Sequence, residues 1–303
     1  MLKKLFVFLF FISGVMISGV YAEPLRFGVL PVIDTLPLQV AVKEGFFNRE
    51  QLEVELVPFT SANERNTAVY SGQLDGFFGD LIATLLIIDK KLARDNEVPV
   101  KILTISYYTD PDQRMFALVT SPQLVPGSKT ELTVAVSKAS IIEYLLTWFQ
   151  KLPTSGQYSF QAVEIKQMPI RLQMLLAGKI DSALLPEPLV SLAESKGARV
   201  LDTDQALNMP LTILNISTNR LNQKDAFLRA YGKAVLELNK NPEKYRDLMA
   251  ETCRIPKPLV KSFPMYKYPA PRVPSESEVK PVQDWMVEKD LLSSAISYKL
   301  LVP

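Results

Sequence analysis

The 303-residue chain is 48% hydrophobic and 22% charged, which is typical of a globular protein and excludes a disordered one. It has no His and one Cys, which excludes the Ser-His-Asp triad, imidazole general bases, intrachain disulfides and thiolate metal clusters. For Cys253 the sequence favours a small buried residue over a reactive thiol. These absences favour a binding protein over an enzyme, and we expect no catalytic residue, no metal ligand and no cofactor.

The first 22 residues have the features of a secretory signal peptide. Lys3 and Lys4 precede a mostly apolar run over 5–20, and Val20 and Ala22 are small residues suited to cleavage after Ala22. A retained membrane anchor is the alternative, but the run is shorter than the roughly 20 residues of a spanning helix. No Cys near the cleavage point could carry a lipoprotein anchor. The mature protein is therefore expected outside the inner membrane.

The mature chain is electrically balanced. Two of the 34 basic residues and none of the 32 acidic residues lie in the first 22 positions, which leaves 32 of each sign. A net charge of zero gives no argument for binding to nucleic acid or to an anionic membrane surface.

The first part of the mature chain alternates between strands and helices. Strands are predicted over 25–30, 52–59, 74–78 and 98–106, and helices over 37–48, 61–71 and 79–91. Ser61 can cap its helix, and Glu64 three residues later completes a capping-box signature. The β-α-β-α-β-α-β order predicts an α/β domain with a largely parallel sheet.

After a polar crossing at 107–114 the alternation starts again. Strands are predicted over 115–120, 132–136, 160–166, 180–184, 198–201 and 211–217, with helices over 140–152, 170–177 and 188–196. The remainder is mostly helical, over 225–239, 242–252, 256–262 and 276–288.

Both halves contain a helix that ends at Gly just before a strand with an Asp. The pattern is Gly72-Gln73-Leu74-Asp75 in one half and Gly178-Lys179-Ile180-Asp181 in the other. These segments, with 37–47, Gly79-Asp80 and 186–188, resemble periplasmic solute-binding proteins of the sulfonate, nitrate, taurine and thiamine-precursor type. The resemblance spans about residues 25 to 250 and rests on the order and spacing of the pieces.

This resemblance implies a type II periplasmic-binding-protein fold, with two hinged α/β lobes and a ligand cleft between them. Lobe one would contain residues 23–108 and 214–303, and lobe two residues 109–213. The implied function is the periplasmic substrate-binding component of an ABC-type importer that captures a small organic solute by hinge closure. Its implied partners are that solute and the inner-membrane permease, and the protein itself would be a monomer.

Two other functions remain open on the same fold. The chain could be a ligand-sensing module that presents its ligand state to a membrane-bound kinase. It could also be a His-independent enzyme of cofactor-precursor biosynthesis that uses carboxylates for acid–base work.

Ligands of open α/β sheets lie at the carboxyl ends of strands, where helix N-termini also point. The residues expected there to contact ligand are Asp34, Thr35, Ser61, Asp80, Tyr108, Ser137, Ser140, Gln167 and Glu187. Several have a purely structural alternative: Asp34, Ser61, Asp80 and Ser140 could only cap helices, and Tyr108 could only pack at the hinge. The carboxylates in this set face only Lys138, so the sequence favours a neutral or cationic ligand, such as a heteroaromatic precursor, over sulfonate or nitrate.

Overall fold

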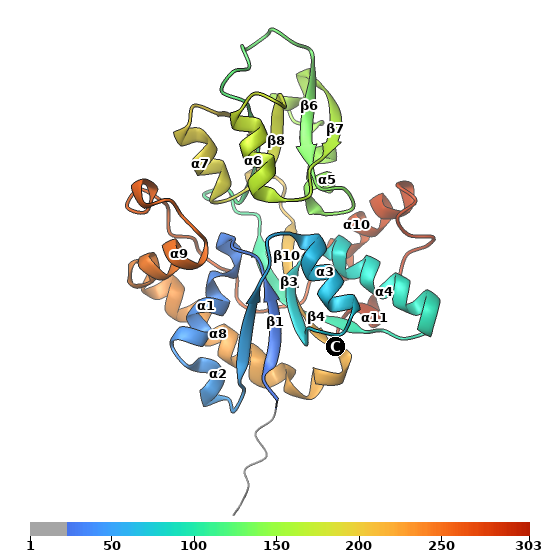
Figure 1. Ribbon diagram of the computed structural model, residues 1–303. Coiled ribbons are helices and arrows are strands. Elements are labelled where there is room, and N and C mark those ends of the chain that lie inside the picture. Colours follow the sequence, from blue (N-terminus) through green and yellow to red (C-terminus); the bar gives the residue numbers. More distant parts are fainter. Residues whose placement is uncertain (1–22) are drawn as a thin grey trace, which may run out of the picture.

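The computed structural model describes residues 23–303, and the predicted signal peptide lies outside these residues. The chain forms two five-stranded sheets, each covered by helices (Figure 1). We refer to the lower half of Figure 1, built from residues 23–108 and 210–303, as lobe one. Lobe two is the upper half, residues 109–209.

The sheet of lobe one has the strand order β2-β1-β3-β10-β4. Its strands are β1 (Leu25–Val29), β2 (Val54–Pro58), β3 (Gly76–Gly79), β4 (Val100–Tyr108) and β10 (Pro210–Ser217). Its helices are α1 (Leu36–Lys43), α2 (Phe46–Arg49), α3 (Ala62–Tyr70), α4 (Leu81–Asp95), α8 (Lys224–Lys240), α9 (Arg246–Thr252), α10 (Glu276–Glu288) and α11 (Tyr298–Leu301). Helices α1 and α2 pack on α8, while α3 and α10 pack on α4.

The sheet of lobe two has the order β7-β6-β8-β5-β9. Its strands are β5 (Phe116–Thr120), β6 (Glu131–Val136), β7 (Ser159–Glu164), β8 (Ser182–Pro186) and β9 (Arg199–Thr203). Its helices are α5 (Ile141–Phe149), α6 (Met168–Leu176) and α7 (Leu189–Ser195). The α/β alternation predicted from the sequence is therefore confirmed in both halves.

Each sheet is largely parallel and includes one antiparallel strand: β10 runs antiparallel to β3 and β4, and β5 runs antiparallel to β8 and β9. The structure differs from the sequence predictions in three local features. The helix predicted over 37–48 is broken at Gly45, whose φ of 65° ends α1 before α2 begins. The segment 256–262 forms only a 3-10 turn at Lys257–Leu259, which follows Pro256 and contains Pro258. The lobe boundary predicted at residue 214 falls inside β10, which begins at Pro210.

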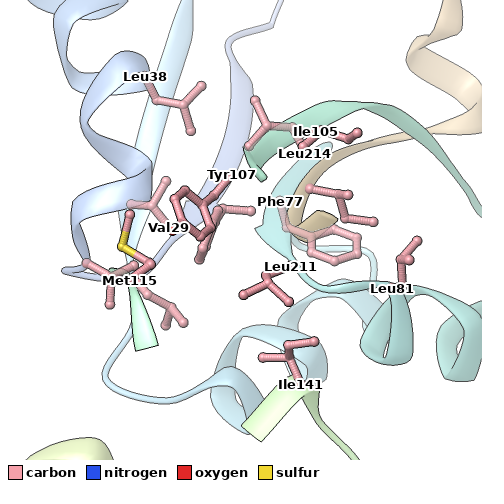
Figure 2. Packing of buried hydrophobic residues seen from close by; sticks show 14 of the residues in the cluster. Val29, Leu38, Phe77, Leu81, Ile105, Tyr107, Met115, Ile141, Leu211 and Leu214 are labelled. Atoms are coloured by element: carbon pink, nitrogen blue, oxygen red, sulfur yellow. The ribbon is translucent and has the colours of Figure 1, made fainter. Parts of the chain in front are cut away.

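One hydrophobic cluster connects the two lobes. It contains core residues of lobe one such as Phe77 and Leu214, and also Met115, Ile141 and other residues of lobe two. Figure 2 shows Met115 and Ile141 of lobe two together with residues of lobe one such as Leu211. Cys253 lies buried in the same hydrophobic cluster, and burial raises the pKa of its thiol to about 12.

None of the helices within residues 23–303 is long and apolar enough to span a bilayer.

Two glycines, Gly76 in β3 and Gly232 in α8, give a testable prediction about close packing. A Cβ at Gly76 would lie 2.5 Å from the Phe27 ring and 2.8 Å from the Asn215 carbonyl oxygen, so Gly76→Ala should lower the free energy of unfolding by about 1–3 kcal/mol. At Gly232, inside α8, the nearest atom would be Pro271 Cγ at 3.4 Å. Gly232→Ala is the matched control and should be neutral or stabilising by up to about 1 kcal/mol. Urea denaturation of both variants checks this, and equal effects would contradict it.

Candidate functional site

A cavity lies between the two lobes at the carboxyl ends of their strands. It encloses about 570 Å³ of space free of atoms, including its opening to solvent. Most of its lining is apolar, with Phe78 and Val32 from lobe one and Phe116, Ile141 and Met168 from lobe two. Its polar lining consists of Asp34, Arg65, Asp80, Thr212, Ser137, Ser140, Lys166 and Arg171. Both lobes therefore supply polar and apolar groups to the same space.

Asp34 follows β1 and faces the cavity from lobe one. Its side chain is 2% exposed, and its Oδ2 accepts a 2.7 Å hydrogen bond from Thr212 Oγ1 on β10. Thr212 in turn accepts a hydrogen bond from the hydroxyl of Ser106. Burial raises the pKa of Asp34 to about 7, because the bond from Thr212 only partly offsets the desolvation of the carboxylate. No side-chain bond caps α1, so Asp34 does not act as the helix cap considered from the sequence.

Asp80 caps one helix and contacts the other lobe. Its Oδ1 accepts a 2.8 Å bond from the backbone N–H of Ala83 in the first turn of α4. Its Oδ2 lies 3.4 Å from the backbone nitrogen of Ile141, the first residue of α5 in lobe two. A carboxylate at a helix N-terminus is favourably placed because the helix dipole is positive there. Asp80 is thus a direct polar link between the lobes.

Ser137 and Ser140 line the lobe-two wall beside this link. The Ser140 hydroxyl donates to the Ser137 carbonyl oxygen at 2.6 Å and accepts from the backbone N–H of Ile142 at 3.3 Å. Ser140 is therefore the cap of α5 as well as a cavity residue. Four of the residues predicted from the sequence therefore line the cavity: Asp34, Asp80, Ser137 and Ser140. Their contact with a ligand stays a prediction.

Three of the remaining predicted residues lie near the cleft without lining the cavity. Thr35 is buried and donates to the carbonyl oxygens of Val32 and Leu30, which closes the turn after β1. Ser61 caps α3 through the backbone N–H of Glu64, as the capping alternative required. The Glu64 carboxylate accepts from Thr60 instead of completing a capping box at Ser61. Gln167 is exposed at the start of α6, between two cavity residues.

Tyr108 and Glu187 have partners that keep them outside the cavity. The Tyr108 hydroxyl donates to the Asn208 carbonyl oxygen at 3.0 Å, so it ties together the two crossings between the lobes. Glu187 is 1% exposed and accepts from Arg114 Nε at 2.9 Å and from the backbone N–H and hydroxyl of Ser191. Burial raises the pKa of Glu187, and Arg114 opposes that shift. The Glu187 carboxylate thus stabilises the hinge region through Arg114.

Sequence reasoning missed two buried arginines in the cavity wall, Arg65 on α3 and Arg171 on α6, each 1% exposed. A signal for both was present. Arg65 lies three residues before Ala68, and Arg171 lies four residues before Leu175, so each cation stands on the buried face of its helix. An Arg on the apolar face of an amphipathic helix is unusual, because charged side chains are rarely buried without a partner.

The charge of the cleft therefore differs from the expectation drawn from the sequence. Lys138 is exposed and does not line the cavity, and Glu187 lies away from it. The cations that do line it are Arg65, Arg171 and Lys166. The premise behind the preference for a neutral or cationic ligand was wrong, because the helix faces that bring these arginines inward were not considered.

The raised pKa of Asp34 gives a pH-dependent prediction for stability. Between about pH 4 and pH 7 the unfolded carboxyl loses its proton while the folded one keeps it, so folding becomes less favourable as pH rises. We expect the free energy of unfolding of the wild type, relative to Asp34→Asn, to fall across this window by at most about 4 kcal/mol. Urea denaturation of both proteins at a series of pH values measures the difference. Other groups titrate in both proteins and cancel, so a constant difference would contradict this assignment.

Several solved structures have the same architecture as this protein. The periplasmic aliphatic sulphonate binding protein SsuA from Escherichia coli aligns with a TM-score of 0.71 at 17% identity, over 93% of this chain and 92% of that one. SsuA from Xanthomonas axonopodis pv. citri, bound to MOPS, gives a TM-score of 0.69 at 16% identity, over 89% and 95% of the two chains. The ligand-binding component of an ABC-type import system from Staphylococcus aureus, with zinc bound, gives 0.68 at 16% identity, over 93% and 97%. At these identities the similarity establishes a shared fold.

A match to a family model shows which protein family the sequence belongs to. No curated protein sequence matches the chain. The NMT1-like family model, however, matches residues 20–255, which is most of the chain. These findings confirm the resemblance to solute-binding proteins inferred from the short sequence segments. The chain belongs to the NMT1-like family.

Proposed function

We propose that this protein is the periplasmic substrate-binding component of an ABC-type importer, and that it captures a small organic solute by closing lobe one onto lobe two. The observation that carries the proposal is the single cavity at the strand ends of both lobes, lined by Asp80 and Arg65 from one and Ser140 and Arg171 from the other. A solute in this position contacts both lobes only when they are closed, so its binding favours the closed state.

The comparisons support this proposal. The proteins with this fold from Escherichia coli and Staphylococcus aureus are described as a periplasmic sulphonate-binding protein and as a ligand-binding component of an ABC-type import system. By analogy, the closed protein would deliver its solute to an inner-membrane permease as a monomer. The hinge would consist of the two crossings near residues 109–115 and 204–209, and the proposal contains no catalytic step.

The solute carried by the protein itself tests the capture function. Protein purified from the periplasm should release a bound compound on denaturation that rebinds unchanged to the refolded protein. At about 100 times its dissociation constant, the compound should add about 2.7 kcal/mol of stability, which is a thermal shift of a few degrees at this size. Native mass spectrometry and a thermal-shift assay make the two measurements. Chemical conversion of the compound on incubation with the protein would contradict a pure capture role and favour an enzyme.

The proposed location depends on cleavage after Ala22. The wild-type protein recovered from the periplasmic fraction should begin at Glu23, which intact mass spectrometry can establish. Ala22→Arg places a large charged residue at the −1 position and should leave an uncleaved precursor in the membrane fraction. Ala139→Arg, in an ordered loop of lobe two, is the control for the added charge and should still be cleaved. Recovery of full-length wild type starting at Met1 would contradict the proposed export.

A further inference from the structure

The cavity holds two buried positive charges that have no ion-pair partner. No carboxylate oxygen of residues 23–303 lies within the 4.0 Å ion-pair distance of the guanidinium group of Arg65 or Arg171. Burial lowers the pKa of each to about 10, so both remain charged at neutral pH. A buried charge without an ion-pair partner is costly to the fold, because hydrogen bonds to neutral groups only partly replace the lost energy of hydration. Such a charge indicates that its partner is supplied by something else.

The hydrogen bonds of the two guanidinium groups leave donors toward the cavity. Arg65 uses Nε and Nη2 for the side-chain oxygen of Asn66, at 3.2 and 2.7 Å, and its Nη1 makes no hydrogen bond within the described residues. Arg171 donates to the backbone carbonyl oxygens of Ile165 and Leu184, which are neutral. A guanidinium has five N–H donors, so each Arg keeps some of them for another group. Both side chains line the cavity.

The nearby carboxyl groups are poorly placed to neutralise both arginines. Asp80 attracts Arg65, but its two oxygens already accept from the backbone nitrogens of Ala83 and Ile141. Asp34 is bound by Thr212 and faces Tyr107, Asp204, Tyr231, Cys253, Tyr266 and Tyr268, and burial raises its pKa to about 7. Asp34, whose pKa is raised to about 7, is only partly ionised at neutral pH, so Asp34 and Asp80 together do not cancel the two guanidinium charges. A negative charge on the ligand balances the positive charge that remains.

We propose that the cleft binds a small organic monoanion, a carboxylate or sulfonate, whose charged group lies between Arg65 of lobe one and Arg171 of lobe two. The inference rests on the proposed solute-capture function and names the ligand class for it. Fork-shaped guanidinium groups match the paired oxygens of such anions. The apolar side chains of Phe78, Ile141 and Met168 provide a surface for an apolar body, which an inorganic anion lacks. An anion that contacts both arginines holds α3 and α6 together across the cleft.

The first experiment varies only the charge of the ligand. Calorimetric titrations compare benzoate, benzamide and benzylamine, which have nearly the same size and carry negative, zero and positive charge, with butanesulfonate as a second anion. We expect benzoate and butanesulfonate to bind and the other two to fail. Equal or tighter binding of benzamide or benzylamine would overturn the assignment of an anionic ligand. The distance between the lobes, measured with a spin label on each lobe, separates this failure from failure of the capture function. If binding of benzamide or benzylamine narrowed that distance distribution, the lobes would still close on a solute and only the ligand class would be wrong.

The second experiment varies the arginines. Arg65→Met keeps much of the side-chain volume and removes the charge, and it should weaken benzoate binding by about 30-fold or more. Its melting temperature should stay unchanged or rise, because an unpaired buried charge is removed. Lys138→Met makes the same charge change on the exposed loop of lobe two and should leave affinity nearly unchanged. Equal losses in both variants would point to long-range attraction alone and overturn the proposal.

A crystallographic test does not depend on the choice of organic ligand. Bromide soaked into crystals of the wild type should give an anomalous peak between the guanidinium groups of Arg65 and Arg171. Rubidium soaked in the same way should give none there. Arg65→Met crystals should lose the bromide peak. Rubidium in the cavity, or bromide that persists in the variant, would overturn the proposal, as would failure of all four organic compounds and bromide to bind.

Discussion

The arrangement of this protein depends on its chain crossing between two sheets and returning. β4 ends at Tyr108 and β5 starts at Phe116, while the return runs from β9 to β10, which completes the first sheet at Pro210. This double crossing turns the carboxyl ends of both sets of parallel strands toward each other. The loops and helix N-termini that follow those strands then meet in one cavity. The return strand also brings Thr212 to Asp34, so the crossing itself forms part of the cavity wall.

Electrostatics in this cavity is governed by desolvation. The same burial that raises the pKa of Asp34 lowers the pKa of Arg65 and of Arg171, because each environment disfavours the charged form. Asp34 can respond by keeping its proton near neutral pH, whereas an arginine stays charged. The cleft without ligand is therefore left with a cationic character that its own carboxyl groups do not cancel. A cavity with unbalanced charge is a binding site in which a bound ligand of the opposite charge adds to the stability of the protein.

The sequence was sufficient for features that depend on neighbouring residues. The alternation of strands and helices and the cap of α3 at Ser61 both involve residues a few positions apart. Four of the predicted ligand contacts line the cavity because strand ends and helix starts are visible in the sequence.

Features that depend on distant residues could not be predicted in the same way. Glu187 pairs with Arg114, which lies 73 positions earlier, so its carboxylate belongs to the hinge and not to the cavity. The antiparallel direction of β10 follows from its return from the second lobe, which periodicity does not report. The helical period places Arg65 and Arg171 on the buried faces of α3 and α6, but the cavity that these faces enter forms only when the two lobes come together.

The central claim is that the two lobes close on a solute in this cavity. Spin labels on cysteines introduced at exposed Lys90 in lobe one and Lys179 in lobe two allow the distance between the lobes to be measured by pulsed electron paramagnetic resonance. Buried Cys253 should remain unlabelled. With saturating solute recovered from the protein itself, the broad distribution expected for the free protein should narrow to a single distance. A distribution that is identical with and without this solute would contradict capture by lobe closure.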